Sequence, residues 1–122
     1  LWPDISIEWA KLIPQPHQSN PYLNAQFLGK AKEVKKMLKQ AHKHLSADDQ
    51  GEFTHYFLNH QDTCDLDYKC DIFQCLNKTN VEKDFIINNR VINKEFNTKP
   101  LVIHGNSTDG KYKLKSIESN LK

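Results

Sequence analysis

The sequence predicts an α/β or α+β fold in one small domain. Three observations support this prediction. Apolar residues recur at helical spacing in two central segments, short apolar runs bounded by turn residues follow them, and a further helical pattern closes the chain. The 122 residues allow at most one domain, since a domain has roughly 150 residues. The hydrophobic share of 38% predicts a thin core, and the aromatic share of 10% argues against wholesale disorder.

The charge balance excludes several classes of partner. Seventeen Lys and Arg against fifteen Asp and Glu give a net charge of +2, which is too small to indicate binding to nucleic acid or to an anionic membrane. No apolar run approaches the roughly 18 residues of a membrane span. Two glycosylation triplets, at Asn77 and Asn106, hint at a secretory route.

The three cysteines do not form a zinc or redox motif. Cys64, Cys70 and Cys75 fall within twelve residues, and none belongs to a C-x-x-C pair. In a straight strand Cys70 and Cys75 would lie about 16 Å apart, too far for a disulfide. A Cys64–Cys70 disulfide across a turn and three buried thiols stay as alternatives.

The first third of the chain is predicted as loop, strand and helix. Residues 1–21 hold four of the five prolines and predict a loop with one turn near residues 7–12. Residues 22–29 are aromatic-rich and end in Gly29, which predicts a strand. From Lys30 onward the apolar residues take helical spacing, with lysines on the other face, and predict about four turns of amphipathic helix. These apolar residues are Ala31, Val34, Met37 or Leu38, Ala41 and Leu45.

A second helix is predicted from Ser46 to about Asn59. Ser46 suits an N-cap, with Asp49 three residues later in the manner of a capping box. Phe53, Tyr56 and Phe57 have the spacing of one helix face, which we expect to be buried.

Short strands and a last helix are predicted after a polar loop over residues 60–68. Residues 70–76 predict a strand. Residues 84–92 predict a hairpin whose turn, Asn88-Asn89-Arg90, suits left-handed backbone geometry. Residues 100–103 predict a buried strand covered on both faces. After a polar loop over 107–110, a helix is predicted from Lys111.

The first candidate site follows the strand at residues 100–103. His104 would lie at the carboxyl end of that strand, where open α/β sheets bind ligands. Gly105 would let the backbone of Asn106 approach a phosphate, and Lys111 could reach the same group. Neutral imidazole is a common metal ligand. The alternative is a structural histidine that caps the strand.

Two further candidates lie earlier in the chain. Asp48 and Asp49 could bind an acceptor hydroxyl or act as general base, or they could merely complement a helix dipole. Trp2, in a proline-rich loop, could stack on a sugar ring or a base, or it could anchor that loop.

Taken together, these segments resemble the glycosyltransferase domain of the procollagen-lysine hydroxylases. Trp2-Pro3-Asp4 is similar to the family's Cys-Trp-Pro segment, and residues 22–29 to its strand ending in F-I-G. Asp48-Asp49-Gln50 resembles the end of the aspartate run in D-D-Q-L-F-Y-T. Residues 66–77 resemble L-D-H-x-x-x-I-F-Q-N-L-N, and residues 100–106 resemble the segment that ends in H-G-N-G. The matches keep their order over nearly the whole chain.

The resemblance implies a fold, a reaction and roles for these residues. The fold is a GT-A type, Rossmann-like domain with a mixed sheet and flanking helices, acting with Mn2+ and a UDP-sugar. It would transfer galactose or glucose to collagen hydroxylysine, in the endoplasmic reticulum lumen or after secretion. His104 corresponds to a metal ligand and Trp2 to a residue beside the sugar. Gly105, Asn106 and Lys111 fall at the diphosphate, and Asp48 and Asp49 at the acceptor.

Departures from the family limit what we expect of the chain alone. Ser107 replaces the second glycine of H-G-N-G, and the aspartate run is cut to two. The family's Asp-x-Asp metal motif precedes its Trp-Pro segment, so residues 1–122 are expected to be a partial domain that lacks the nucleotide-binding N-terminal half. Fe2+ and 2-oxoglutarate would belong to a separate hydroxylase domain, absent here. We expect the chain alone to be inactive. The alternative is a non-catalytic secreted binding module, which an upstream Asp-x-Asp would argue against.

Overall fold

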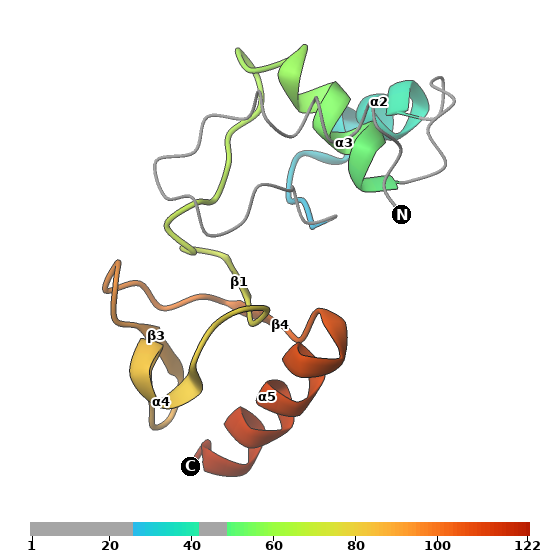
Figure 1. Cartoon of the computed structure of the whole chain (residues 1–122). Helices are drawn as coiled ribbons and strands as arrows, with labels where there is room; N and C mark the ends of the chain where they lie inside the picture. The colour runs from blue at the N-terminus through green and yellow to red at the C-terminus, as the bar shows by residue number, and fades with distance from the viewer. Residues whose placement is uncertain (1–25, 42–48) are drawn as a thin grey trace. The chain divides into compact units, whose positions relative to one another are not determined.

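The computed structural model describes residues 26–41 and 49–122 (Figure 1). The loop predicted over residues 1–21 and the proposed cap Ser46 lie outside the described residues. The chain divides into two compact units, one up to Asp65 and the other from Leu66 to Lys122. Within the part of the chain that the structure describes, no helix is long and apolar enough to cross a membrane.

Two helices form the described part of the first unit. Helices α2 (Ala31–Ala41) and α3 (Asp49–Leu58) pack side by side (Figure 1). As predicted, Ala41 is buried in α2, while the lysines of that helix are exposed. On α3, Tyr56 and Phe57 are buried and Phe53 is half-buried, so the predicted aromatic face is confirmed.

The strand predicted over residues 22–29 is wrong for the residues that are described. Residues 26–29 have no regular secondary structure. Instead, the ring of Phe27 packs against that of Phe53 on α3, with 5.3 Å between the ring centroids. Phe27, one of the aromatic residues that suggested a strand, thus contacts a helix instead.

The second unit confirms the α/β class with two small sheets. Strands β1 (Phe73–Cys75) and β4 (Val102–His104) pair in parallel, and β2 (Phe85–Ile87) and β3 (Val91–Asn93) pair antiparallel. The short helix α4 (Val81–Asp84) precedes β2, and α5 (Ser107–Asn120) follows β4 (Figure 1).

The hairpin is confirmed, but its turn differs from the prediction. Ile86 lies opposite Ile92, and Asn88, Asn89 and Arg90 connect the strands. None of these three turn residues has a positive φ. In the described residues, left-handed backbone occurs elsewhere, at Cys70, Lys78, Asn97 and Ser107.

The polar loop predicted over residues 107–110 is wrong, because α5 already begins at Ser107. Gly110 interrupted the helical pattern in the sequence. In the structure, however, it is buried in the first turns of the helix, where the backbone of Gly105 approaches it closely. The glycine is there for close packing and does not end the helix.

The core of the second unit is small. Leu76, Phe85, Val91 and Ile117 are buried, and Ile103 packs against them. The prediction that strand 100–103 is covered on both faces is wrong, since Leu101 is 79% exposed and Val102 42% exposed. Among the described strands, β4 pairs with β1 alone, so only the side of Ile103 meets the core.

A buried pair of amide side chains joins the two sheets. Gln74 on β1 is 5% exposed and Asn93 on β3 is 7% exposed. Asn93 Nδ2 donates to Gln74 Oε1 at 2.8 Å, and Gln74 Nε2 donates to the carbonyl oxygen of Cys75 at 2.9 Å. Asn93 Oδ1 accepts from the backbone N–H of Glu95 and Phe96. These buried polar groups are thus satisfied by one another and by backbone.

We predict that Gln74→Met lowers the free energy of unfolding by about 1–3 kcal/mol, because the side chain keeps its size while Asn93 Nδ2 and the Cys75 carbonyl lose buried partners. Urea unfolding measures the change. Asn89→Ala, in the exposed hairpin turn, is the control and should have little effect. Equal stability of the two variants would contradict the structural role of the pair.

Candidate functional site

The candidate site lies where β1 and β4 end side by side. Cys75 and His104 are opposite each other in the parallel register. The N–H of Leu76 donates to the carbonyl oxygen of His104 at 3.0 Å, and the Nδ1 atom of His104 lies 3.9 Å from Cys75 Sγ. His104 is half-buried and is the last residue of its strand, as predicted.

Gly105 and Asn106 carry the chain from β4 into α5. A Cβ atom at Gly105 would lie 2.9 Å from the carbonyl oxygen of Gly110 and 3.1 Å from Leu114 Cβ. Gly105 does not have a positive φ, so this position needs glycine for the close approach of loop to helix. Asn106 Oδ1 accepts from the N–H of Asn77 at 3.0 Å, which ties this loop to the segment after β1.

The backbone is strained at Ser107, the first residue of α5. Asn106 occupies the N-cap position, but its side chain makes no capping hydrogen bond. Ser107 has a φ of 64°, left-handed geometry that suits glycine better than serine. Its Oγ accepts from the N–H of Gly110 at 3.3 Å. A helix N-terminus placed after a parallel strand has the geometry that binds phosphate groups.

Two lysines of α5 differ in their surroundings. Lys111 is exposed and forms no ion pair with the residues that the structure describes. Lys113, which the sequence did not single out, pairs with Asp109 and also donates to the carbonyl oxygen of Leu76 at 3.4 Å. Lys111 is therefore the one of the two whose ammonium group is not held by a neighbouring carboxylate.

The donor atoms near His104 fit Mn2+ only in part. Imidazole is a suitable ligand, but the neighbouring Cys75 sulfur is soft, and Mn2+ prefers carboxylate or water oxygens. Among residues 26–41 and 49–122, no three His, Cys, Asp or Glu side chains are grouped as a metal site. His104 can thus supply one ligand, and the others would have to come from outside the described residues.

Of the acceptor-side candidates, only Asp49 is described. It is exposed in the first turn of α3, and its Oδ1 accepts from the N–H of Gln50 at 2.9 Å. Trp2 and Asp48 lie outside the described residues. The structure thus brings together His104, Gly105 and Asn106 in the second unit, and places Asp49 in the first.

Asp67 has a structural role that the sequence did not reveal. Its carboxylate accepts three backbone N–H groups, from Asp71, Ile72 and Phe73, at 2.7–2.9 Å. These bonds hold the segment that leads into β1, so Asp67 in the Asp-x-Asp spelling at residues 65–67 supports the strand. Within this loop Cys70 takes a left-handed φ of 56°. All three cysteines are reduced, so the Cys64–Cys70 disulfide is not formed.

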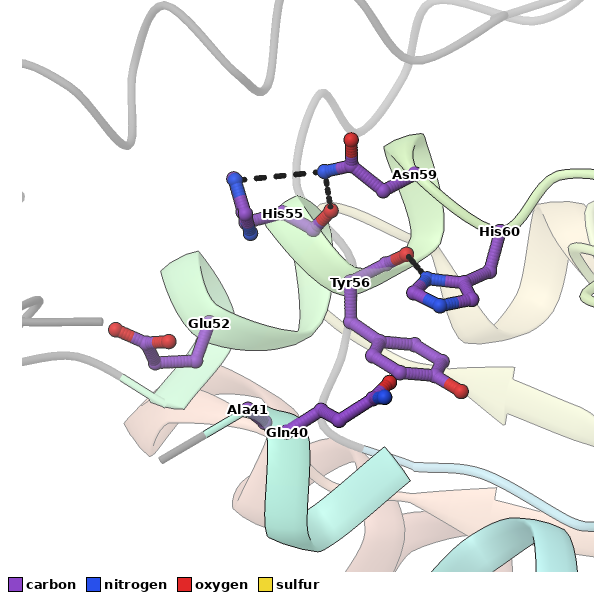
Figure 2. A pocket seen from close by; sticks show the side chains of 7 residues that line it. All are labelled: Gln40, Ala41, Glu52, His55, Tyr56, Asn59 and His60. Atoms are coloured by element: carbon purple, nitrogen blue, oxygen red, sulfur yellow. Dashed lines mark hydrogen bonds between the residues drawn. The ribbon is translucent and has the colours of Figure 1, made fainter. Parts of the chain in front are cut away.

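A second feature that the sequence did not reveal is a pocket of about 260 Å³ between α2 and α3 (Figure 2). Polar side chains line most of it: Gln40, Glu52, His55, Tyr56, Asn59 and His60. The rings of Tyr56 and His60 stack with 3.9 Å between centroids. The helical spacing of Tyr56 and Phe57 indicated only a buried face, because a pocket depends on how two helices meet.

Comparisons with known proteins agree with the resemblance noted above. A family model described as the PLOD GT domain matches residues 1–121. Procollagen-lysine,2-oxoglutarate 5-dioxygenase 2 of Mus musculus is 32% identical over 114 residues, covering 87% of this chain and 15% of that protein. An uncharacterized protein of Acanthamoeba polyphaga mimivirus is 34% identical over 107 residues, covering 86% of this chain and 22% of that protein. The chain thus spans less than a quarter of either relative. No solved structure matches it significantly.

We predict that Gly105→Ala destabilises the chain by about 1–3 kcal/mol, the usual range for forcing a methyl group into packed structure. Thermal or urea unfolding measures the loss. The matched control is Gly29→Ala, whose added Cβ would meet only the side-chain tip of Val34 at 3.2 Å, so its loss should be smaller. A Gly105→Ala chain as stable as the control would show that the loop does not pack closely on α5.

A pH-dependent stability is predicted for Cys70. Burial, and after it the carboxylate of Asp67, raises the pKa of the Cys70 thiol from 9.0 to about 11. Since the unfolded chain loses this proton first, the thiol's contribution to stability is intact below about pH 9 and is lost as the pH rises to about 11.

Urea unfolding over this pH range measures the effect. Cys70→Asn removes the titrating group and suits left-handed backbone. The free energy of unfolding of the original chain should fall relative to that of the variant between these pH values. Parallel pH profiles would contradict the burial of this thiol.

Proposed function

Because the chain belongs to the family of PLOD glycosyltransferase domains, we propose that it is part of a domain that transfers a sugar from a UDP-sugar to hydroxylysine in collagen-like chains. In this proposal residues 1–122 form the second half of the domain, the protein works in the endoplasmic reticulum lumen or after secretion, and the sugar is galactose or glucose. The family supports a glycosyltransferase-like domain directly, and the donor, acceptor and location extend that finding.

The observation that carries the proposal is the passage from β4 through Gly105 and Asn106 into α5. The helix N-terminus carries a partial positive charge and N–H groups that suit a diphosphate. Lys111 adds a cation in the first turns of the same helix, with no carboxylate of the described residues holding it. These groups would bind the diphosphate of the donor and of the UDP product.

His104 would provide one ligand for Mn2+ at the end of β4. When bound, the metal neutralises the negative charge that develops on the departing diphosphate. The N–H of Leu76 donates to the carbonyl oxygen of His104, and the backbone of the next residue, Gly105, packs closely on Gly110. These contacts fix the backbone of His104, and with it the imidazole, at the end of β4. In this proposal the chain's own residues thus place the imidazole of His104 and the ammonium group of Lys111 beside the departing diphosphate.

The acceptor would be oriented by Asp48 and Asp49. A carboxylate that accepts the hydrogen bond of the acceptor hydroxyl fixes its direction of attack and can take its proton. The exposed position of Asp49 in the first turn of α3 is compatible with this role. Trp2 would border the sugar, a role supported by the resemblance alone.

We predict that the complete protein that carries this segment binds UDP, and that Mn2+ strengthens this binding. Lys111→Ala should weaken UDP binding by about tenfold, as expected for the loss of one charge-assisted contact. Lys115→Ala, on the exposed side of the same helix, is the control and should leave binding unchanged. His104→Ala should abolish the gain from Mn2+ but leave metal-free UDP binding intact. Isothermal titration calorimetry measures all four proteins.

The His104→Ala substitution also tests the sugar-transfer reaction in the complete protein that carries this segment. There, His104→Ala should lower sugar transfer to a hydroxylysine peptide without unfolding the protein. UDP binding that responds to neither His104→Ala nor Lys111→Ala would contradict the proposed site. Sugar binding with no transfer by the complete protein would favour a non-catalytic binding module.

A further inference from the structure

The chain leaves β1 through a turn that contains an acceptor triplet for N-linked glycans. Asn77-Lys78-Thr79 has the required hydroxyl residue two positions after the asparagine, with no proline between them. The N–H of Thr79 donates to the carbonyl oxygen of Leu76 at 3.2 Å, which closes a β-turn with Asn77 and Lys78 at its centre. Lys78 is exposed and has a left-handed φ of 59°, which the third residue of a β-turn can adopt. The triplet thus lies in a surface turn, the setting expected of a glycosylated asparagine.

The carboxamide of Asn77 has no other use in the described fold. The backbone N–H of Asn77 donates to Asn106 Oδ1, but its side chain forms no hydrogen bond with the residues that the structure describes. Asn77 is half-buried, as is Thr79. A group attached to Asn77 Nδ2 therefore replaces no hydrogen bond of this part of the chain.

A groove adjoins the turn and gives an attached sugar space. It lies between α4, β2 and α5, has a volume of about 610 Å³, and is lined in part by Thr79 of the triplet. Its lining also includes Phe85, which is buried, and Tyr112, which is 70% exposed. Exposed aromatic rings offer an apolar surface to the face of a sugar ring. A sugar on Asn77, two residues before Thr79, thus has room beside the turn.

The second acceptor triplet, at residues 106–108, has a different setting. Its last two residues belong to α5, and Asn106 is the N-cap of that helix. Asn106 Oδ1 accepts from the N–H of Asn77 and lies 3.5 Å from the place that a Cβ atom of Gly110 would take. The carboxamide of Asn106 is thus held beside the close contact of Gly105 with Gly110, where a bulky group has little room.

We propose that Asn77 carries an N-linked glycan and that Asn106 does not, although both have the acceptor triplet. Asn77 Nδ2 forms a bond to the anomeric carbon of a sugar that a lipid carries through a diphosphate. The bond from that carbon to the diphosphate breaks, one proton leaves Nδ2, and the lipid diphosphate is released. The glycan rests on the proposed function for its location, because this transfer takes place in the lumen of the endoplasmic reticulum.

The test is mass spectrometry that resolves each site in the complete protein that carries this segment, produced in eukaryotic cells. A secretion signal and a tag with its own acceptor triplet are fused to the protein, so a glycosylated tag shows that the lumen was reached. Peptide N-glycosidase in heavy-oxygen water then converts each glycosylated asparagine to a labelled aspartate. Asn77 should be labelled in most molecules, and Asn106 in almost none.

Two pairs of variants confirm the site. Thr79→Ser keeps the hydroxyl of the triplet and should keep the glycan, whereas Thr79→Val has a similar size but lacks the hydroxyl and should lose it. Asn77→Gln should lower the mass of the protein by one glycan, and the matched control Asn106→Gln should not. Because the original protein is measured first, a variant that fails to fold leaves the main result intact.

Two results would overturn the glycan site when the tag is glycosylated. They are an unlabelled Asn77, and labelling of Asn106 at the same level as Asn77. The same protein without the added signal tests the location separately. An unmodified tag in that protein contradicts the proposed location alone, whereas a modified tag with an unmodified Asn77 contradicts only the glycan site.

Discussion

The hydrogen bond between the buried side chains of Gln74 and Asn93 is the constraint on which the second unit depends. Each of its sheets has two strands of three residues, and such small sheets are barely stable alone. The amide pair joins β1 to β3, and the register of β1 with β4 then places His104 opposite Cys75. Asp67 supports the same strand from its other end, through the N–H groups that lead into β1. The position of the candidate metal ligand therefore follows from a few hydrogen bonds more than from a large core.

The turn into α5 joins close packing to backbone strain. Gly105 and Gly110 let the loop and the helix approach each other more closely than any side chain would allow. Between these two glycines in the sequence, Ser107 takes left-handed geometry. This is the position where the family's H-G-N-G segment has its second glycine. A non-glycine residue in that geometry costs roughly 1–2 kcal/mol. Serine thus takes a left-handed backbone conformation at the start of α5, although glycine would suit that conformation better.

The sequence by itself determined the family, the α/β class and most elements that have a local signal. Helical spacing predicted α2 and the aromatic face of α3, and apolar runs beside turn residues predicted β1, the hairpin and β4. The tertiary structure alone decided three features. Residues 26–29 are not a strand, because Phe27 packs on α3. Helix α5 starts at Ser107, because Gly110 meets Gly105. Leu101 and Val102 are exposed, because β4 has only β1 beside it among the described strands. Periodicity records which residues are apolar, whereas these features depend on which distant residue each one meets. The Gln74–Asn93 pair and the pocket between α2 and α3 escaped prediction for the same reason, since a polar side chain shows a buried partner only once the chain has folded.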